Sequence, residues 1–117
     1  MNGEALITNL FDTSLARRKS DSNDPVRSVL VLNPKIDPNV LSLLLPTRIA
    51  DVLGLLELRL NPKRLNPIRL TLRGSTCSVE PFETSGDQIV IGGIPLTALG
   101  LMLDSTGQLV DDPYPSR

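Results

Sequence analysis

The chain of 117 residues contains no histidine and only one cysteine, Cys77. Without histidine, a single protomer cannot build a Ser-His or Cys-His nucleophilic pair or a histidine metal site. One cysteine cannot form a disulfide within the chain, and we expect Cys77 to be an ordinary strand residue. Carboxylates are therefore the plausible acid and base groups of this protein, and we expect neither a metal nor another cofactor.

Aromatic side chains are scarce, and the chain has almost no net charge. Phe11, Phe82 and Tyr114 are its three aromatic residues, too few for the stacking platforms of single-stranded nucleic-acid binders. Its 12 basic and 13 acidic residues give a net charge of −1. Because such a chain has no general attraction for polyanions, we expect no nucleic-acid partner and no binding to anionic membranes.

Long apolar runs and targeting signals are also missing. The longest uncharged run, from Gln88 to Leu103, has 16 residues and is interrupted by three glycines and a proline. It is therefore short and broken for a membrane span. The segment MNGEALITNLF lacks the basic region and long apolar core of a secretory signal. We expect one cytoplasmic domain covering residues 1–117.

Apolar spacing predicts a mostly β domain. Strands are expected where apolar and polar residues alternate, or where a short apolar run is continuous. The expected strands cover residues 5–10, 26–32, 41–45, 55–60, 68–72, 76–80, 88–91 and 108–110. Two of these segments remain ambiguous, because the spacing from Glu4 to Leu15 and the leucines of residues 41–45 would also suit helices.

Two segments favour short helices. In residues 47–53, Ile49, Val52 and Leu53 would share one buried face, and Gly54 can supply the left-handed stop. Residues 95–103 predict a second short helix that runs into a strand.

Three segments are expected to connect or end these elements. Residues 17–25 contain no apolar side chain and predict a mobile, solvated loop. The sequence NPKRLNP, residues 61–67, predicts a rigid connection pinned by its prolines. Residues 111–117 are expected to form a tail.

Two apolar segments, residues 37–54 and 89–110, are similar in order and spacing to the two signatures of a known family. Asp37 is followed nine residues later by Pro46 and then by RIADVLG, and Gly92 precedes a leucine-containing helix and Asp104. This arrangement resembles the retropepsin-like aspartic peptidases of the small, single-domain bacterial type. The resemblance implies a closed, mostly β acid-protease barrel with one or two short helices. It also implies a homodimer, because each protomer supplies one catalytic aspartate.

By the same resemblance, Asp37 is the catalytic residue of an active-site loop that includes Pro38, Asn39, Ile91 and Gly92. Two carboxylates that lie close together share a proton, since both cannot ionise cheaply. One of them activates water while the protonated partner polarises the peptide carbonyl. The substrate would be a peptide or a protein, and the loops around Asp37 and Gly92 should stack together in the core. Without the resemblance, Asp37 to Asn39 is an ordinary turn.

Departures from the family pattern predict impaired or absent activity. Pro38 replaces a Thr or Ser whose hydroxyl ties the two active-site loops together, and it has no N–H. Asn39 replaces a glycine that allows close backbone approach. The flap hairpin over the substrate is shortened to the NPKRLNP bend and lacks a glycine tip. The alternatives are a non-catalytic dimeric binding or scaffold protein, and an unrelated small viral accessory protein.

Five basic residues are close together in the sequence: Arg59, Lys63, Arg64, Arg69 and Arg73. They would suit a phosphate or an acidic partner. The favoured interpretation is a set of solvated charges that discourage aggregation at a sheet edge. Three of the five should lie on the solvent side of a hairpin formed by the strands at 55–60 and 68–72. The sequence DSTG at Asp104 is interpreted as a turn.

Overall fold

The computed structural model describes residues 3–10, 12, 26–55, 57–60 and 63–112, with backbone only for 57–60 and 63. The strands are β1 (Glu4–Asn9), β2 (Ser28–Leu32), β3 (Lys35–Ile36), β4 (Leu43–Pro46), β5 (Glu57–Leu60), β6 (Lys63–Leu65), β7 (Ile68–Leu72), β8 (Ser75–Val79), β9 (Phe82–Thr84), β10 (Val90–Ile91), β11 (Leu101–Leu103) and β12 (Leu109–Asp111). The helices are α2 (Thr47–Leu53) and α3 (Gly93–Leu99).

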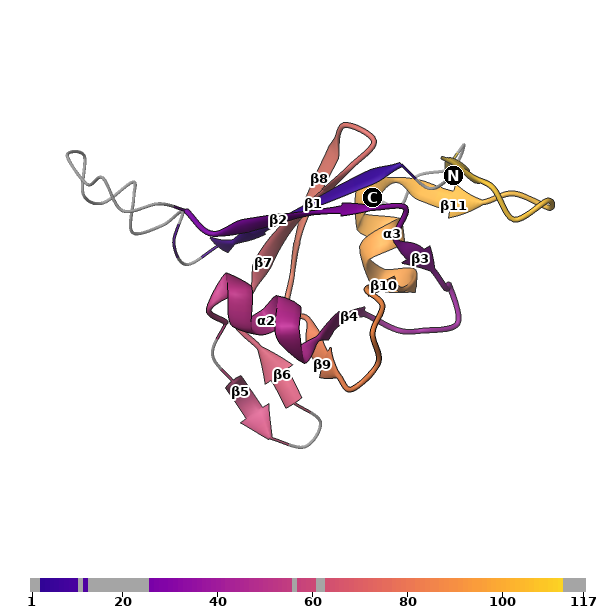
Figure 1. Cartoon of the computed structure of the whole chain (residues 1–117). Helices are drawn as coiled ribbons and strands as arrows, with labels where there is room; N and C mark the ends of the chain where they lie inside the picture. Colours follow the sequence, from indigo (N-terminus) through magenta and orange to yellow (C-terminus); the bar gives the residue numbers. More distant parts are fainter. Residues whose placement is uncertain (1–2, 11, 13–25, 56, 61–62, 113–117) are drawn as a thin grey trace.

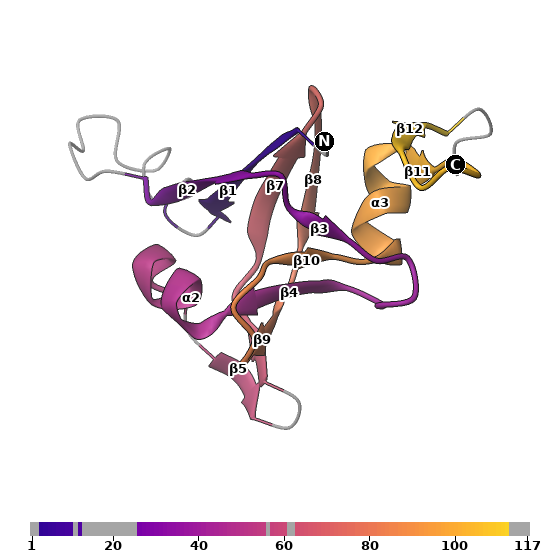
Figure 2. The ribbon, with the colours of Figure 1, turned by 45° about the vertical axis from the view of Figure 1, so that its right-hand side comes forward.

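The described strands form three sheets. The four-stranded sheet has the order β2-β1-β7-β8, the six-stranded sheet has the order β3-β10-β4-β9-β6-β5, and β11 pairs with β12. Figures 1 and 2 show α2 and α3 at opposite ends of the strands β4 and β10. The predicted mostly β class is therefore confirmed. The predicted barrel closure is not, because the two end strands of each described sheet do not pair with one another.

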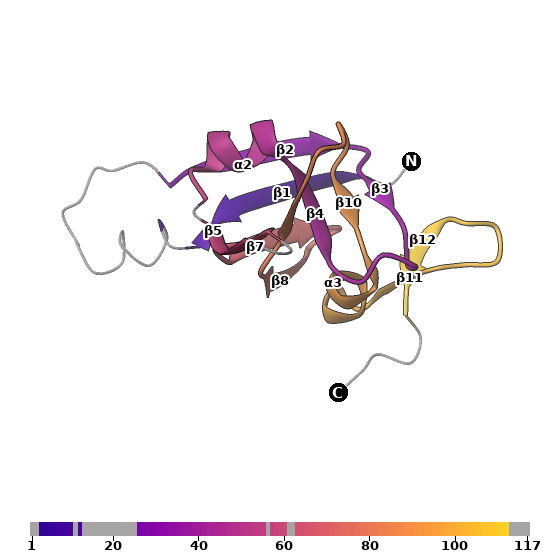
Figure 3. The ribbon, with the colours of Figure 1, turned by 90° about the horizontal axis from the view of Figure 1, so that it is seen from below.

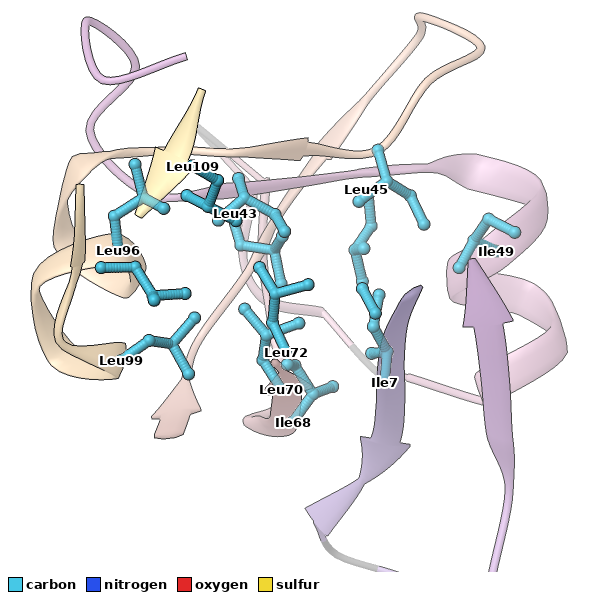
Figure 4. Close-up of a cluster of buried hydrophobic side chains, with 14 of the residues drawn as sticks. Ile7, Leu43, Leu45, Ile49, Ile68, Leu70, Leu72, Leu96, Leu99 and Leu109 are labelled. Atoms are coloured by element: carbon cyan, nitrogen blue, oxygen red, sulfur yellow. The ribbon is translucent and has the colours of Figure 1, made fainter. Parts of the chain in front are cut away.

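The core lies between the two larger sheets and the helices. On β7 the alternation expected from the sequence is present, because Ile68, Leu70 and Leu72 are fully buried while the residues between them are half-buried. Figure 4 shows leucines of β4 and α3 and an isoleucine of α2 in the same cluster. At about 25 cal/mol per Å² of apolar surface, such burial is the main source of stability.

The helix α2 has the predicted bounds. Pro46, with a φ of −57°, precedes its first turn, and Gly54 ends it in the left-handed conformation with a φ of 67°. The predicted buried face is partly wrong, because Val52 is 60% exposed and Ala50 is buried instead. The buried stripe is centred between Leu53 and Ala50 on the helical wheel, which directs Val52 to solvent.

The predicted hairpin between residues 55–60 and 68–72 is wrong. The strand β5 pairs with β6, in the register Leu60 with Lys63, whereas β7 pairs with β1 and β8. The segment 61–67 is therefore more than a connection, since it contains β6. The sequence also did not indicate β9, which pairs with β4 and β6. Both strands are three residues long, too short for a period of two to be visible.

The remaining predicted strands are confirmed with small shifts in their bounds, and the N-terminal segment is a strand at residues 4–9. The loop predicted at 17–25 lies outside the described residues, as do residues 113–117 of the predicted tail. In the part of the chain that is described, no helix is both long and apolar enough to cross a membrane.

A polar junction connects the start of β2 to the end of α2. Arg27 donates to both carboxylate oxygens of Asp12, from Nε at 2.8 Å and from Nη2 at 2.9 Å. The hydrogen bond from Arg27 holds the pKa of Asp12 below its usual value. Nearby, buried Asn9 donates from Nδ2 to the Leu53 carbonyl at 2.7 Å. The Arg27 guanidinium occupies the space where Gly54 would carry a Cβ. Both this overlap and the left-handed φ of Gly54 therefore favour glycine at this position.

Alanine substitutions at Gly54 and Gly100 separate these two reasons. Both glycines have a left-handed φ, 67° and 73°, but a Cβ at Gly100 would meet no atom within 4 Å. We expect Gly100→Ala to lower the free energy of unfolding by about 1 kcal/mol through backbone strain. Gly54→Ala should cost more, because Arg27 must also leave Asp12. Urea unfolding measures both, and equal losses would show that Arg27 moves aside freely.

Candidate functional site

The Asp37 turn is held by a strand that comes more than fifty residues later in the sequence. β10 pairs in parallel with β3, just before Asp37, and antiparallel with β4, just after the turn. The chain therefore enters the turn on one side of β10 and leaves it on the other, as Figure 2 shows. The Asp37 N–H donates to the Ile91 carbonyl at 3.0 Å, and the Val40 N–H donates to the Asp37 carbonyl at 3.0 Å. These two bonds fix the backbone at Asp37.

Gly92 brings the two segments into close backbone contact. A Cβ at Gly92 would overlap the carbonyl oxygens of Val40 and Ser42. The next two N–H groups along the chain, those of Gly93 and Ile94, donate to the carbonyls of Val40 and Leu41 at 2.8 and 2.9 Å. The predicted stacking of the loops around residues 37 and 92 is thus confirmed, but their predicted place in the core is not, because Pro38 and Asn39 are exposed.

The Asp37 carboxylate is half-buried and is oriented by its own turn. Its Oδ1 accepts a hydrogen bond from the Asn39 N–H at 3.0 Å, which makes the turn an Asx turn. Pro38 and Asn39 are both exposed. Among the described residues, no basic side chain pairs with Asp37, and no cluster of three or more potential metal ligands is present. The described chain therefore supplies one oriented carboxylate at this turn.

An apolar concavity of about 560 Å³ lies beside Asp37. It is lined by Pro38, Asn39, Val40, Leu41, Gly93, Ile94, Thr97 and Ala98. Two of its large side chains are strongly exposed, Leu41 at 69% and Ile94 at 52%. Both residues lie within the two signature segments, 37–54 and 89–110, and Leu41 was expected in a strand, but nothing in the sequence indicated that their side chains are exposed. Contiguous exposed apolar side chains are a common feature of binding surfaces.

The β5–β6 hairpin is located at the bend where the resemblance places a shortened flap. It turns between Leu60 and Lys63, which pair across the hairpin. Through β6 and β9, it belongs to the same sheet as β3 and β4, the strands that flank the Asp37 turn. The hairpin is thus a short extension of the sheet that carries the candidate site.

Three of the five predicted basic residues, Arg64, Arg69 and Arg73, have described side chains, and they belong to two different sheets. Arg64 lies in the six-stranded sheet, 3.5 Å from a carboxylate oxygen of Glu80 and 5.9 Å from the centre of the Phe82 ring. Arg69 lies in the four-stranded sheet, and Arg73 follows it in the β7–β8 turn, where it donates to the Leu109 carbonyl. The side chains of Arg59 and Lys63 lie outside the description.

Two other residues singled out in the sequence have structural roles. The Oδ1 atom of Asp104 accepts hydrogen bonds from the side chain and N–H of Thr106 and from the N–H of Gln108. These bonds, above all the one from the Thr106 hydroxyl, lower the pKa of Asp104, and its interpretation as a turn residue is confirmed. Cys77 is a strand residue as predicted, and burial raises the pKa of its thiol to about 11.

The close contact at Gly92 predicts a large effect of one methyl group. The φ of Gly92 is −91°, so alanine there meets no backbone strain, only overlap with two carbonyl oxygens. We expect Gly92→Ala to cost about 3 kcal/mol in the free energy of unfolding, because two backbone segments must separate. Gly86→Ala, where the nearest atom is the Thr84 hydroxyl at 3.6 Å, is the control. Chemical denaturation with an unchanged midpoint for Gly92→Ala would contradict the contact.

Comparison with known proteins provides no family assignment. No model of a protein family matches the chain, and neither a curated protein nor a solved structure is similar to it. The candidate site is therefore argued from its own geometry.

Proposed function

We propose that the protein is a retropepsin-like aspartic peptidase that works as a homodimer, with weak hydrolytic activity. The observation that carries this proposal is the pairing of β10 with both β3 and β4, which holds the Asp37 turn against Gly92. Such an arrangement presents a carboxylate from a rigid backbone, and catalytic groups require this rigidity. The sequence resemblance supplies the chemistry that the carboxylate would perform.

In the proposed dimer, the two Asp37 carboxylates form one catalytic unit. They share a proton, because two adjacent negative charges are unfavourable. The Asn39 N–H holds Oδ1, which leaves Oδ2 for the shared proton or for the attacking water. The ionised carboxylate removes a proton from water as water adds to the peptide carbonyl, and the protonated carboxylate polarises that carbonyl.

The apolar concavity supports a second copy as the partner at this site. In the family, a hydroxyl next to the aspartate ties the loops together, and Pro38 has no such group. Leu41 and Ile94 lie on the same surface as Pro38 and are exposed in the single chain. Burial of these side chains against a second copy would replace the lost polar contacts with apolar ones. This exchange allows dimerisation while making the catalytic geometry less precise.

Hydrolysis of a randomised peptide library at pH 4–6 tests the catalytic part of the proposal. We expect slow cleavage by the wild-type protein and a loss of about 100-fold or more in Asp37→Asn, since the amide cannot act as a base. Cleavage should decline both above and below this range, because one carboxylate must be ionised and the other protonated. Cleavage that survives Asp37→Asn would exclude the proposed chemistry.

The oligomeric state tests the dimer. We expect sedimentation to show a wild-type dimer, and Ile94→Lys to be monomeric, because burial of two lysines beside the twofold axis is strongly unfavourable. Val52→Lys is the matched control, because Val52 is also exposed, at 60%, but lies on α2. A dimer that persists in Ile94→Lys would show that this surface is not the interface.

A non-catalytic dimeric binding protein is the second candidate. Pro38 provides neither a hydroxyl nor an N–H at the place where the family ties its loops, and the β5–β6 hairpin turns as early as Leu60. Both features weaken catalysis more than they weaken the dimer. This candidate predicts a wild-type dimer that Ile94→Lys dissociates and that cleaves no peptide in the library.

A further inference from the structure

The strand β2 forms one edge of the four-stranded sheet, and three of its residues direct their backbone groups away from that sheet. The Asn9 N–H donates to the Arg27 carbonyl, and the Asn33 N–H donates to the Gly3 carbonyl. In an antiparallel ladder the hydrogen-bonded pairs alternate, so residues 29 and 31 also bond to β1. The N–H and C=O groups of Ser28, Leu30 and Leu32 therefore point outward.

Among the described residues, the strand itself lacks the sequence features that usually protect an exposed edge. Its five residues, SVLVL, include no charge and no proline, and its register with β1 is continuous. Leu30 is 56% exposed, Leu32 is 69% exposed, and Leu6 lies directly opposite Leu30 on β1. The opposite edge of the sheet, β8, has exposed Thr76 and Ser78 on alternate positions. The two edges differ, and β2 is the apolar one.

A groove of about 370 Å³ runs along β2. One wall consists of residues 29–35, and the other consists of Arg48 and Ile49 of α2 with residues 87–89. Figure 3 shows β2 as the outer strand next to β1, with α2 alongside it. The volume is within the range of ligand-binding clefts. Because the groove has a second wall, a single extended chain fits it better than the thick edge of another domain.

We propose that β2 binds an extended segment of a partner protein, which adds a fifth strand to the sheet within this groove. The backbone groups of Ser28, Leu30 and Leu32 would supply the hydrogen bonds, and alternate apolar side chains of the segment would cover the two leucines. The proposed strand site is distinct from the Asp37 surface, and it does not depend on the proposed function.

The charges beside the groove indicate the chemistry of the segment. Lys35 and Arg48 line it together with one acidic residue, Asp87. Arg48 donates to the backbone carbonyl of Asp87 at 3.2 Å, a bond that leaves its positive charge without compensation. The two exposed leucines favour a segment that is apolar at alternate positions. The excess of one positive charge beside the groove favours a segment that also carries a carboxylate.

Fluorescence anisotropy with a synthetic peptide tests the site. The probe is a labelled peptide, EVTLTVT, blocked at both ends and measured at pH 7, where the proposed hydrolysis is suppressed. Two further versions carry N-methyl groups, each on one of the two alternating sets of amides. Only one set can face β2, so one version should lose about tenfold in affinity while the other binds like the parent. Equal behaviour of the two versions would overturn the proposal.

Variants of the protein give an independent check. Leu30→Pro removes an outward N–H that β1 does not use, and proline is tolerated at such edge positions. Thr76→Pro makes the matched change on β8, since Thr76 pairs with Thr71 next to a hydrogen-bonded pair and its N–H points outward. We expect weaker peptide binding in Leu30→Pro only. If Leu30→Pro does not fold, the two N-methylated peptides still test whether a segment pairs with β2.

Two other results would also overturn the peptide site. A lysine in place of the probe's glutamate should weaken binding several-fold, and unchanged or stronger binding would exclude the assigned charge preference. A wild-type oligomer that Leu30→Pro dissociates, with no peptide binding, would assign the edge to a second copy. None of these binding measurements depends on the hydrolytic activity of Asp37. The peptide-binding proposal and the peptidase proposal can therefore be overturned independently of each other.

Discussion

The interaction on which the candidate site depends is the backbone contact between Gly92 and the turn that follows Asp37. Two carbonyl oxygens, from Val40 and Ser42, occupy the space that a side chain at position 92 would need. The contact is possible only because β10 lies between β3 and β4. Three further hydrogen bonds, from the N–H groups of Asp37, Gly93 and Ile94, depend on this arrangement. Without it, Asp37 would belong to an ordinary surface turn.

The rest of the fold supports this contact by burying the surfaces on either side of it. Leu43 and Leu45 place two fully buried side chains of β4 in the core, and α3 contributes Leu96 and Leu99. These leucines place α3, which follows the contact, in the same core cluster as β4, which follows the Asp37 turn. Because the same leucines stabilise the domain and the turn, changes in the core should affect the position of Asp37 even when they do not touch it.

Much of the local structure could be predicted from the sequence where a residue or a pattern strongly favours one backbone conformation. Pro46 and Gly54 mark the ends of α2, and the strict alternation from Ile68 to Leu72 marks β7. The pairing of the strands could not be predicted, because a short basic strand such as β6 obtains its partner from tertiary contacts. The site was predicted through the spacing of Asp37 and Gly92. Its apolar surface was not, since exposure cannot be inferred from residue type alone.

The crossing of β10 between β3 and β4 also has a consequence for how the protein folds. The Asp37 turn has its hydrogen-bond partners at residues 91–94, so more than fifty residues must be synthesised before the turn can adopt its final form. Non-local pairings of this kind slow folding, because the chain loses the entropy of a long loop before the stabilising contacts form. During synthesis on the ribosome, the apolar segment from Val40 to Leu45 leaves the exit tunnel without its partner strand. Leu43 and Leu45, which are fully buried in the folded domain, therefore stay without their partner strand until residues 90–91 have emerged.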